Sequence, residues 1–224
     1  MAEIAALSVI VFIAILDWLA VAFGWHRAKY ITKPLVMIVL IAWLSFNGGW
    51  QYPALFFLAG AVFSLLGDVW LMLPGNYFLA GLVSFLLAHL VYIVGFSVET
   101  PIFTPLLILL TILTIGIAVF VTRKIRQGVF RKTGARRIRW SVTLYSIVIT
   151  VMFLSALATI GKPGWEPVNY LSVALGGLLF YLSDSLLAYD RFVTPIQYGR
   201  LFVRITYHVG QILLLTGAVN HIIH

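Results

Sequence analysis

Residues 102–122 read IFTPLLILLTILTIGIAVFVT, an apolar run without a single charged side chain. A helix rises about 1.5 Å per residue, so a run of roughly 17 to 25 residues crosses the roughly 30 Å hydrocarbon core of a bilayer. The chain of 224 residues is 62% hydrophobic and 10% charged, and its mean hydropathy is +1.05. This composition excludes a water-soluble globule and predicts an all-α membrane protein.

Seven further apolar runs are bounded by Gly, Pro, Asn or clusters of charge. With the first they predict eight membrane spans in one helical bundle, a single integral membrane domain over residues 1–224. The predicted spans are about 4–23, 33–47, 53–73, 77–97, 102–122, 141–160, 168–189 and 200–222. The second run is short, and without it the count is seven. The N-terminal run is too long for a signal peptide and lacks a small-residue cleavage site, so we interpret it as a retained span.

The 15 Lys and Arg residues give a formal charge of +8, and they are unevenly distributed among the predicted loops. Fourteen fall on one side of the predicted membrane, and only Lys162 lies opposite. The positive-inside rule then predicts cytoplasmic basic loops and two external termini, as expected for a bacterial inner membrane protein. We interpret the densest set, within residues 123–139, as a loop that signals topology and attracts anionic lipid. No nucleic-acid module accompanies it, so no nucleic acid partner is expected.

Three Asp residues lie inside predicted spans: Asp17, Asp68 and Asp184. An Asp near the centre of a membrane helix costs roughly 2.5 to 3.5 kcal/mol on insertion scales, so each is a candidate for function. Alternate spans run in opposite directions, which puts the three residues about five or six positions from the same membrane face. We therefore expect Asp68 and Asp184 to line a common polar cavity. Pairing with Lys33 across the first loop is a structural explanation for Asp17.

Further polar side chains lie inside the predicted spans, most of them in the same cytoplasmic half and His89 nearer the midplane. They are Lys33, Ser64, His89, Tyr92, Tyr145, Tyr207, His208 and Gln211. Residues three and four apart share a helix face, so the small and polar residues from Gly60 to Asp68 form one inward stripe. For Ser64 and Tyr92 ordinary helix packing is the competing interpretation. For Lys33 and His89 it is a snorkelling lysine and a buried histidine.

Two blocks of sequence surround the intramembrane acids. The first comprises KPL at 33–35, FSLLGDVWLML at 63–73 and SFLLAHLVY at 84–92, and the second comprises LSDSLLA at 182–188 and YHVGQ at 207–211. Together they strongly resemble the YhhN-type lysoplasmalogenase family over about residues 17–215. The resemblance implies an eight-helix membrane enzyme whose substrate is a lysophospholipid within membrane lipid. It would hydrolyse the vinyl ether bond of lysoplasmalogens, releasing a fatty aldehyde and glycerophosphocholine or glycerophosphoethanolamine.

This chemistry needs an acid that protonates the alkene carbon remote from oxygen and a group that stabilises the resulting oxocarbenium ion. Two carboxyl groups divide similar work in glycoside hydrolysis, and a buried carboxyl can stay protonated near neutrality. Asp68 and Asp184 are therefore the predicted catalytic pair, with no cofactor and no metal. Lys33 is a candidate to meet the substrate phosphate, and His89 to relay protons. These residues alone do not decide which acid donates the proton.

Two other functions remain open. A metal-dependent lipid hydrolase of amidase or phospholipase type would use His89, His208, Asp68 and Asp184 as zinc ligands, although no spacing such as HExxH supports it. The chain has no Cys, which excludes Cys-based zinc sites and thiolate nucleophiles. A proton-coupled transporter also uses intramembrane Asp and His. In addition, the likeness between residues 66–71 and 182–187 predicts a weak parallel duplication of a four-helix unit.

Overall fold

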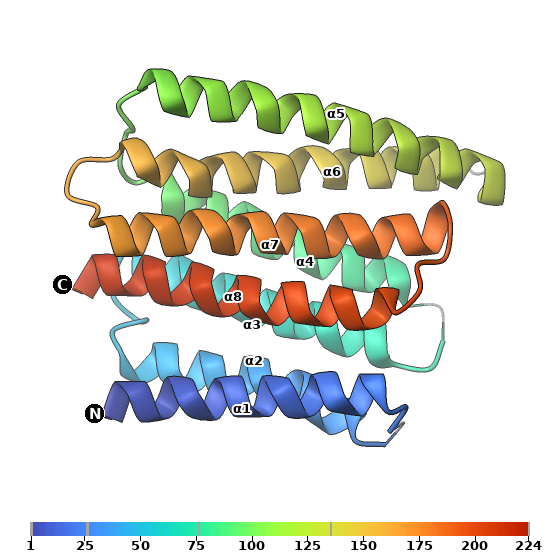
Figure 1. Ribbon diagram of the computed structural model, residues 1–224, viewed down its shortest axis with the longest axis horizontal. Coiled ribbons are helices and arrows are strands. Elements are labelled where there is room, and N and C mark those ends of the chain that lie inside the picture. The colour runs from blue at the N-terminus through green and yellow to red at the C-terminus, as the bar shows by residue number, and fades with distance from the viewer. Residues whose placement is uncertain (1, 26, 76, 135, 224) are drawn as a thin grey trace. The chain divides into compact units, whose positions relative to one another are not determined.

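The computed structural model describes residues 2–25, 27–75, 77–134 and 136–223. Over these residues the chain is all-α, and eight helices are long and apolar enough to cross a membrane, which confirms the predicted fold class (Figure 1). The helices are α1 Ala2–Ala22, α2 Lys29–Phe46, α3 Ala54–Met72, α4 Phe78–Phe96, α5 Pro105–Thr133, α6 Arg136–Leu157, α7 Pro167–Phe192 and α8 Gly199–Ile223, with the short 3-10 helix η1 Ala158–Gly161 after α6.

The helix bounds differ most from the prediction at α5. This helix runs from Pro105 to Thr133, and the next residue, Gly134, caps it with a left-handed φ of 61°. The interpretation of residues 123–139 as a loop was therefore wrong, because the basic residues lie on the ends of α5 and α6. Arg, Lys and Gln are good helix formers, whereas hydropathy alone ends a span at the first charges. The short second run does form a helix, α2, which begins at Lys29.

The chain divides into two compact units, residues Met1–Gly95 with Ala218–His224, and residues Phe96–Gly217. In the first unit α2 packs against α1 and α3, and in the second α5, α6 and α7 pack against one another, side by side in Figure 1. One boundary falls at the end of α4 and the other falls within α8, whose last residues belong to the first unit. The duplication and the single domain both stay predictions.

Small residues allow close helix contacts within each unit. A Cβ added to Gly60 of α3 would lie 2.2 Å from the Tyr92 ring of α4, so this ring rests on the α3 backbone. A Cβ on Gly176 of α7 would lie 2.4 Å from the backbone nitrogen of Leu214 in α8. Such contacts are typical of membrane helices, which associate through small residues. They fix the rotation of each helix and hence which side chains face the interior.

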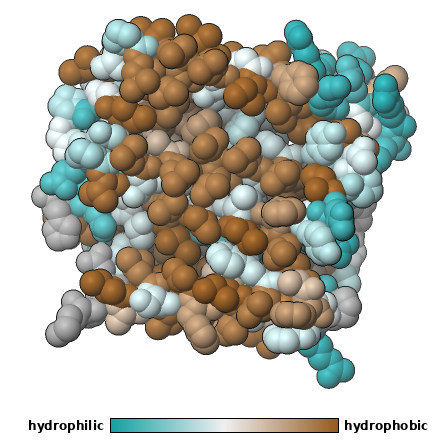
Figure 2. Space-filling view, in the orientation of Figure 1, coloured by the Kyte–Doolittle hydropathy of each residue, from teal (hydrophilic) through white to brown (hydrophobic). Residues whose placement is uncertain are grey.

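The outer surfaces of the helices are apolar. Figure 2 shows hydrophobic side chains over the middle of α5 and α6 and hydrophilic ones gathered near one end of these helices. Exposed Trp and Tyr side chains lie close to helix ends in both units: Trp25, Trp50, Tyr52, Tyr77, Trp140 and Tyr198. Aromatic side chains at this level are characteristic of the membrane interface, and an apolar band between them is suited to lipid.

Candidate functional site

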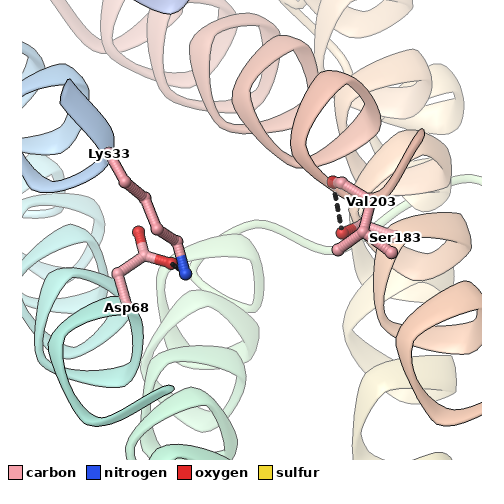
Figure 3. A network of polar contacts seen from close by, with 4 residues as sticks. All are labelled: Lys33, Asp68, Ser183 and Val203. Atoms are coloured by element: carbon pink, nitrogen blue, oxygen red, sulfur yellow. Dashed lines mark hydrogen bonds and ion pairs between the residues drawn. The ribbon is translucent and has the colours of Figure 1, made fainter. Parts of the chain in front are cut away.

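The first intramembrane acid, Asp68, forms an ion pair with Lys33. The Nζ of Lys33 on α2 lies 2.8 Å from Oδ1 of Asp68 on α3, and both residues are buried (Figure 3). Lys33 follows the start of α2 by four residues and Asp68 precedes the end of α3 by four, so the two residues share a level in this unit. The contact places a lysine, one candidate for phosphate binding, directly beside a candidate catalytic acid.

The neighbouring glycine shapes the surroundings of Asp68. A Cβ added to Gly67 would lie 2.6 Å from the Phe85 ring of α4, so the ring lies against the α3 backbone beside the acid. Phe85 and Asp68 are both buried. An apolar ring in this position limits access of water to the ion pair, which strengthens its electrostatic interaction.

Asp17 has a partner across the first loop. Its Oδ1 accepts a hydrogen bond of 2.7 Å from Oγ1 of Thr32, the residue next to Lys33. Asp17 is fully buried on α1. This hydrogen bond ties α1 to the start of α2 and gives Asp17 a structural partner in Thr32, whereas its predicted pairing with Lys33 stays a prediction.

The second candidate acid, Asp184, accepts a hydrogen bond from a tyrosine. The hydroxyl of Tyr145 on α6 donates to Oδ2 of Asp184 on α7, and both residues are buried. Tyr145 follows the start of α6 by nine residues and Asp184 precedes the end of α7 by eight. The two side chains, predicted in the same slab of the membrane, therefore lie at one level within this unit.

Contacts between α7 and α8 hold the backbone around Asp184. The hydroxyl of Ser183 donates to the carbonyl of Val203 at 3.0 Å, as Figure 3 shows. About one helical turn away, the ring of Tyr207 meets the ring of Phe180 edge-on at 5.5 Å between centroids. Phe180 is fully buried and Tyr207 nearly so, which places this contact in the interior of the unit. The orientation of Asp184 is thus constrained by its own helix and by two neighbouring ones.

The remaining predicted site residues lie inside their units. Ser64, His89, Tyr92, His208 and Gln211 are fully buried. Tyr92 stacks on Phe57 with centroids 6.1 Å apart and rests on Gly60, which favours packing as its role. Ser64 lies on the same inward face of α3 as Gly60 and Asp68, as the spacing predicted.

Tyr145 is the candidate whose importance the sequence did not reveal. The sequence placed it in the same slab of the predicted membrane as the acids, and its hydrogen bond to Asp184 puts the two at one level, but it was not among the predicted site residues. The signal was present, because Tyr145 is a polar aromatic residue in the inner part of a predicted span at the level of an acid. Its pairing with Asp184 was not readable, since it depends on the rotation of α6 against α7.

A metal ion within the described part of the chain would need a group of metal-ligating side chains. Among these residues no three His, Asp or Glu side chains lie together as ligands of one ion would.

The one Lys predicted on the opposite side, Lys162, joins two loops of the second unit. Its Nζ donates to the carbonyl of Phe96 and lies 5.8 Å from the centroid of the Trp165 ring. Nε1 of Trp165 donates to Oε2 of Glu99 at 2.7 Å. Burial lowers the pKa of Lys162, and the carboxylate of Glu99 acts in the opposite direction. These contacts fix the loop before α5 to the loop before α7.

Apolar helices that hold buried acids, each with a specific polar partner, define a multi-pass integral membrane protein with polar contacts in its interior. The chain belongs to the YhhN family, whose sequence profile matches residues 28–218. The matched region includes both Asp68 and Asp184 with their partners.

Three relatives show what this chain is similar to. Lysoplasmalogenase TMEM86B of Mus musculus is 28% identical over 199 residues, which is 88% of this chain and 77% of the relative. Lysoplasmalogenase TMEM86B of Homo sapiens is 30% identical over 203 residues, with the same two shares. Lysoplasmalogenase TMEM86A of Bos taurus is 30% identical over 164 residues, 72% of this chain and 64% of the relative. No solved structure matches the chain.

Proposed function

We propose that the protein is a lysoplasmalogenase-like hydrolase that cleaves the vinyl ether bond of lysoplasmalogens. The observation that carries the proposal is the similarity to lysoplasmalogenases, which extends over 88% of the chain at about 30% identity. The substrate would be a 1-alkenyl glycerophosphocholine or glycerophosphoethanolamine in the membrane. The products would be a fatty aldehyde and glycerophosphocholine or glycerophosphoethanolamine.

The reaction proceeds in two stages. An acid donates a proton to the alkene carbon remote from the ether oxygen, and the other alkene carbon becomes an oxocarbenium ion. Water adds to this carbon, its spare proton leaves, and the hemiacetal collapses to aldehyde and alcohol. The sum is one vinyl ether and one water converted to one aldehyde and one alcohol. Two carboxyl groups of different protonation state are sufficient for such a sequence, as in glycoside hydrolysis.

The contacts of the two acids favour a division of labour. Asp68 lies 2.8 Å from the ammonium of Lys33, a partner that stabilises a carboxylate. Asp184 accepts its hydrogen bond from the neutral phenol of Tyr145, a bond that a protonated carboxyl can also accept. We assign Asp184 as the proton donor and Asp68 as the carboxylate that stabilises the cation and directs water. In this assignment Tyr145 positions Asp184.

The remaining residues support these two. Lys33 holds Asp68 and can share its charge with the phosphate of the substrate. His89, Tyr207, His208 and Gln211 are buried polar groups that can orient the substrate or its water. We further propose that the basic ends of the helices face the cytoplasm of a bacterial cell and that both termini lie outside. Reporter fusions at Gly134 and at the C-terminus test this orientation.

A panel of lysolipids tests the activity. Purified full-length protein in detergent micelles is incubated with 1-alkenyl, 1-alkyl and 1-acyl glycerophosphoethanolamine, and aldehyde and fatty acid are measured by mass spectrometry. We expect aldehyde from the alkenyl lipid alone. In heavy water the aldehyde should carry one deuterium on the carbon next to the carbonyl, because that carbon receives the proton. Fatty acid released from the acyl lipid, or no aldehyde at all, would contradict the proposal.

A matched pair of variants tests the site. Asp184→Asn should reduce aldehyde formation by at least roughly a hundredfold, the scale of a lost general acid. Asp190→Asn makes the same change six residues later on α7, where Oδ1 of Asp190 accepts the backbone N–H of Ile196 at 2.7 Å. An Asn oxygen can accept the same bond, so this control should keep its activity. Equal activity in the two variants would remove Asp184 from the mechanism.

A further inference from the structure

The basic end of the α5–α6 hairpin lies beyond the hydrocarbon part of its helices. We define it as residues 123–134 and 136–139. Helix α5 has 29 residues and is therefore about 43 Å long, whereas the hydrocarbon core of a bilayer is about 30 Å thick. Its apolar run ends at Thr122, so the following turns up to Thr133 extend to the level of the lipid headgroups.

The charge of the basic end is not balanced by acids on its own helices. It contains eight cationic residues: Arg123, Lys124, Arg126, Arg131, Lys132, Arg136, Arg137 and Arg139. No Asp or Glu occurs in the sequence between Glu99 and Glu166. On the neighbouring α7, Asp190 is close to the same end of the unit and accepts the backbone N–H of Ile196. The surface therefore has a strong positive excess.

The basic end is fixed in place by contacts with the end of α7. A Cβ added to Gly128 would lie 2.4 Å from the carbonyl oxygen of Phe192, so the two backbones touch. Nζ of Lys132 donates to the carbonyl of Arg191 at 3.1 Å, and Val129 is fully buried. The inner face is occupied by these contacts, which leaves the outer face as a preformed surface.

The cations of the outer face lie beside exposed aromatic rings of the same two helices, within the basic end or next to it. Phe120, Phe130 and Trp140 are each more than half exposed. Nζ of Lys124 lies 5.7 Å from the centroid of the Phe120 ring, and the guanidinium of Arg139 lies 5.5 Å from that of Phe130. Basic residues interleaved with exposed rings are characteristic of surfaces that lie in the membrane interface.

The apolar outer side of α5 is exposed along the span and faces lipid. Of the eight spans α5 is the least buried: 11% of the residues in its most apolar stretch lie inside the protein, against 22% to 50% for the other spans. Its outer side chains, such as Ile112 and Leu113, are exposed along the span. Figure 2 shows the apolar band along α5 and hydrophilic side chains at one end. A lipid that covers this band brings its headgroup to the basic end.

We propose that the outer face of the basic end binds the phosphates of anionic phospholipid headgroups. The Arg side chains offer paired donors for phosphate oxygens, and the exposed rings insert beside the upper acyl chains. Each Lys or Arg near an anionic surface strengthens binding by roughly fivefold at moderate salt. This binding is independent of the proposed hydrolysis, because it uses none of the buried residues of the candidate site.

Native mass spectrometry tests the proposal. Full-length protein is released from micelles that hold equal amounts of dioleoyl phosphatidylglycerol and dioleoyl phosphatidylcholine, and the bound lipids are counted at increasing total lipid. We expect the wild-type protein to retain phosphatidylglycerol preferentially, and this preference to weaken as sodium chloride is raised. The salt series needs no substitution, so it tests the proposal even where a variant is poorly folded.

Matched variants locate the binding. Arg123→Gln, Lys124→Gln and Arg131→Gln, combined, remove three charges from the outer face and keep good helix formers. We expect this variant to bind phosphatidylglycerol on the order of a hundredfold more weakly, with binding of phosphatidylcholine unchanged. The control combines Arg27→Gln, Lys29→Gln and Arg200→Gln, which remove three charges elsewhere, and it should keep the preference.

Three outcomes would overturn the proposal. They are an unchanged preference in the variant of the basic end, an equal loss in the control, and equal binding of the two lipids by the wild-type protein at low salt. Displacement of phosphatidylglycerol by a single-stranded RNA oligonucleotide at comparable concentration would also overturn it, because the surface would then belong to a nucleic acid partner.

Discussion

Replacement of one partner of the Lys33–Asp68 ion pair should destabilise the protein strongly. The side chains are 10% and 1% exposed, and Nζ lies 2.8 Å from Oδ1. Lys33→Met keeps much of the length of the side chain and leaves the Asp68 carboxylate buried without its ammonium. Removal of one partner of such a pair costs about 3 to 5 kcal/mol, whereas replacement of both by apolar residues is often neutral.

A double-mutant cycle measures this effect. The free energy of unfolding is determined by titration of micelles with sodium dodecyl sulfate for wild type, Lys33→Met, Asp68→Leu and the double variant. We expect each single variant to lose about 3 to 5 kcal/mol, with the smaller loss in Asp68→Leu because a lysine near a helix end can extend to the interface. The double variant should recover most of the stability. Lys29→Met, one turn earlier on α2, is the control for loss of a lysine charge alone.

Activity separates the structural role of the pair from its chemical one. The double variant should be stable and should still release no aldehyde, because Asp68 is absent. Additive losses of stability in the cycle would refute the argument that the ion pair couples the two residues. A stable and fully active double variant would refute the chemical role of Asp68 and leave the structural one intact.

Three further results are expected. Asp17→Asn should cost less than about 1.5 kcal/mol of stability and leave turnover nearly unchanged, because Thr32 can donate to an amide oxygen. A loss of turnover comparable to that of Asp184→Asn would instead place Asp17 in the mechanism. Tyr145→Phe should reduce turnover roughly ten- to hundredfold, because a hydrogen bond to an ionisable carboxyl is worth about 1.5 to 3 kcal/mol. It should also alter the pH–rate profile. An unchanged profile would leave Tyr145 a packing residue. Because burial lowers the pKa of Lys162 from 10.5, the unfolded protein binds more protons than the folded one as the pH approaches that value. The thermal midpoint should therefore rise as the pH increases toward 10.5, and Lys162→Met should flatten that rise.

The sequence by itself determined the number of helices and the buried face of α3. In lipid every backbone polar group must be hydrogen-bonded within the protein, and a helix satisfies its own groups, so apolar runs of about 20 residues predict helical spans. The spacing from Gly60 to Asp68 identified the buried face of α3 for a related reason, since three or four residues make about one turn. The acids within the spans and the motifs around them identified the family, and its profile match confirms that identification.

Only the tertiary structure decided which partners these residues have. Lys33 pairs with Asp68 and Tyr145 with Asp184 because packing sets how α2 is rotated against α3 and α6 against α7, and no local pattern contains that information. The length of α5 was also hidden, since its basic turns are stabilised by contacts with Phe192 rather than by apolar composition. Local patterns follow from the helix period and the bilayer, whereas side-chain partners depend on distant segments brought together by packing.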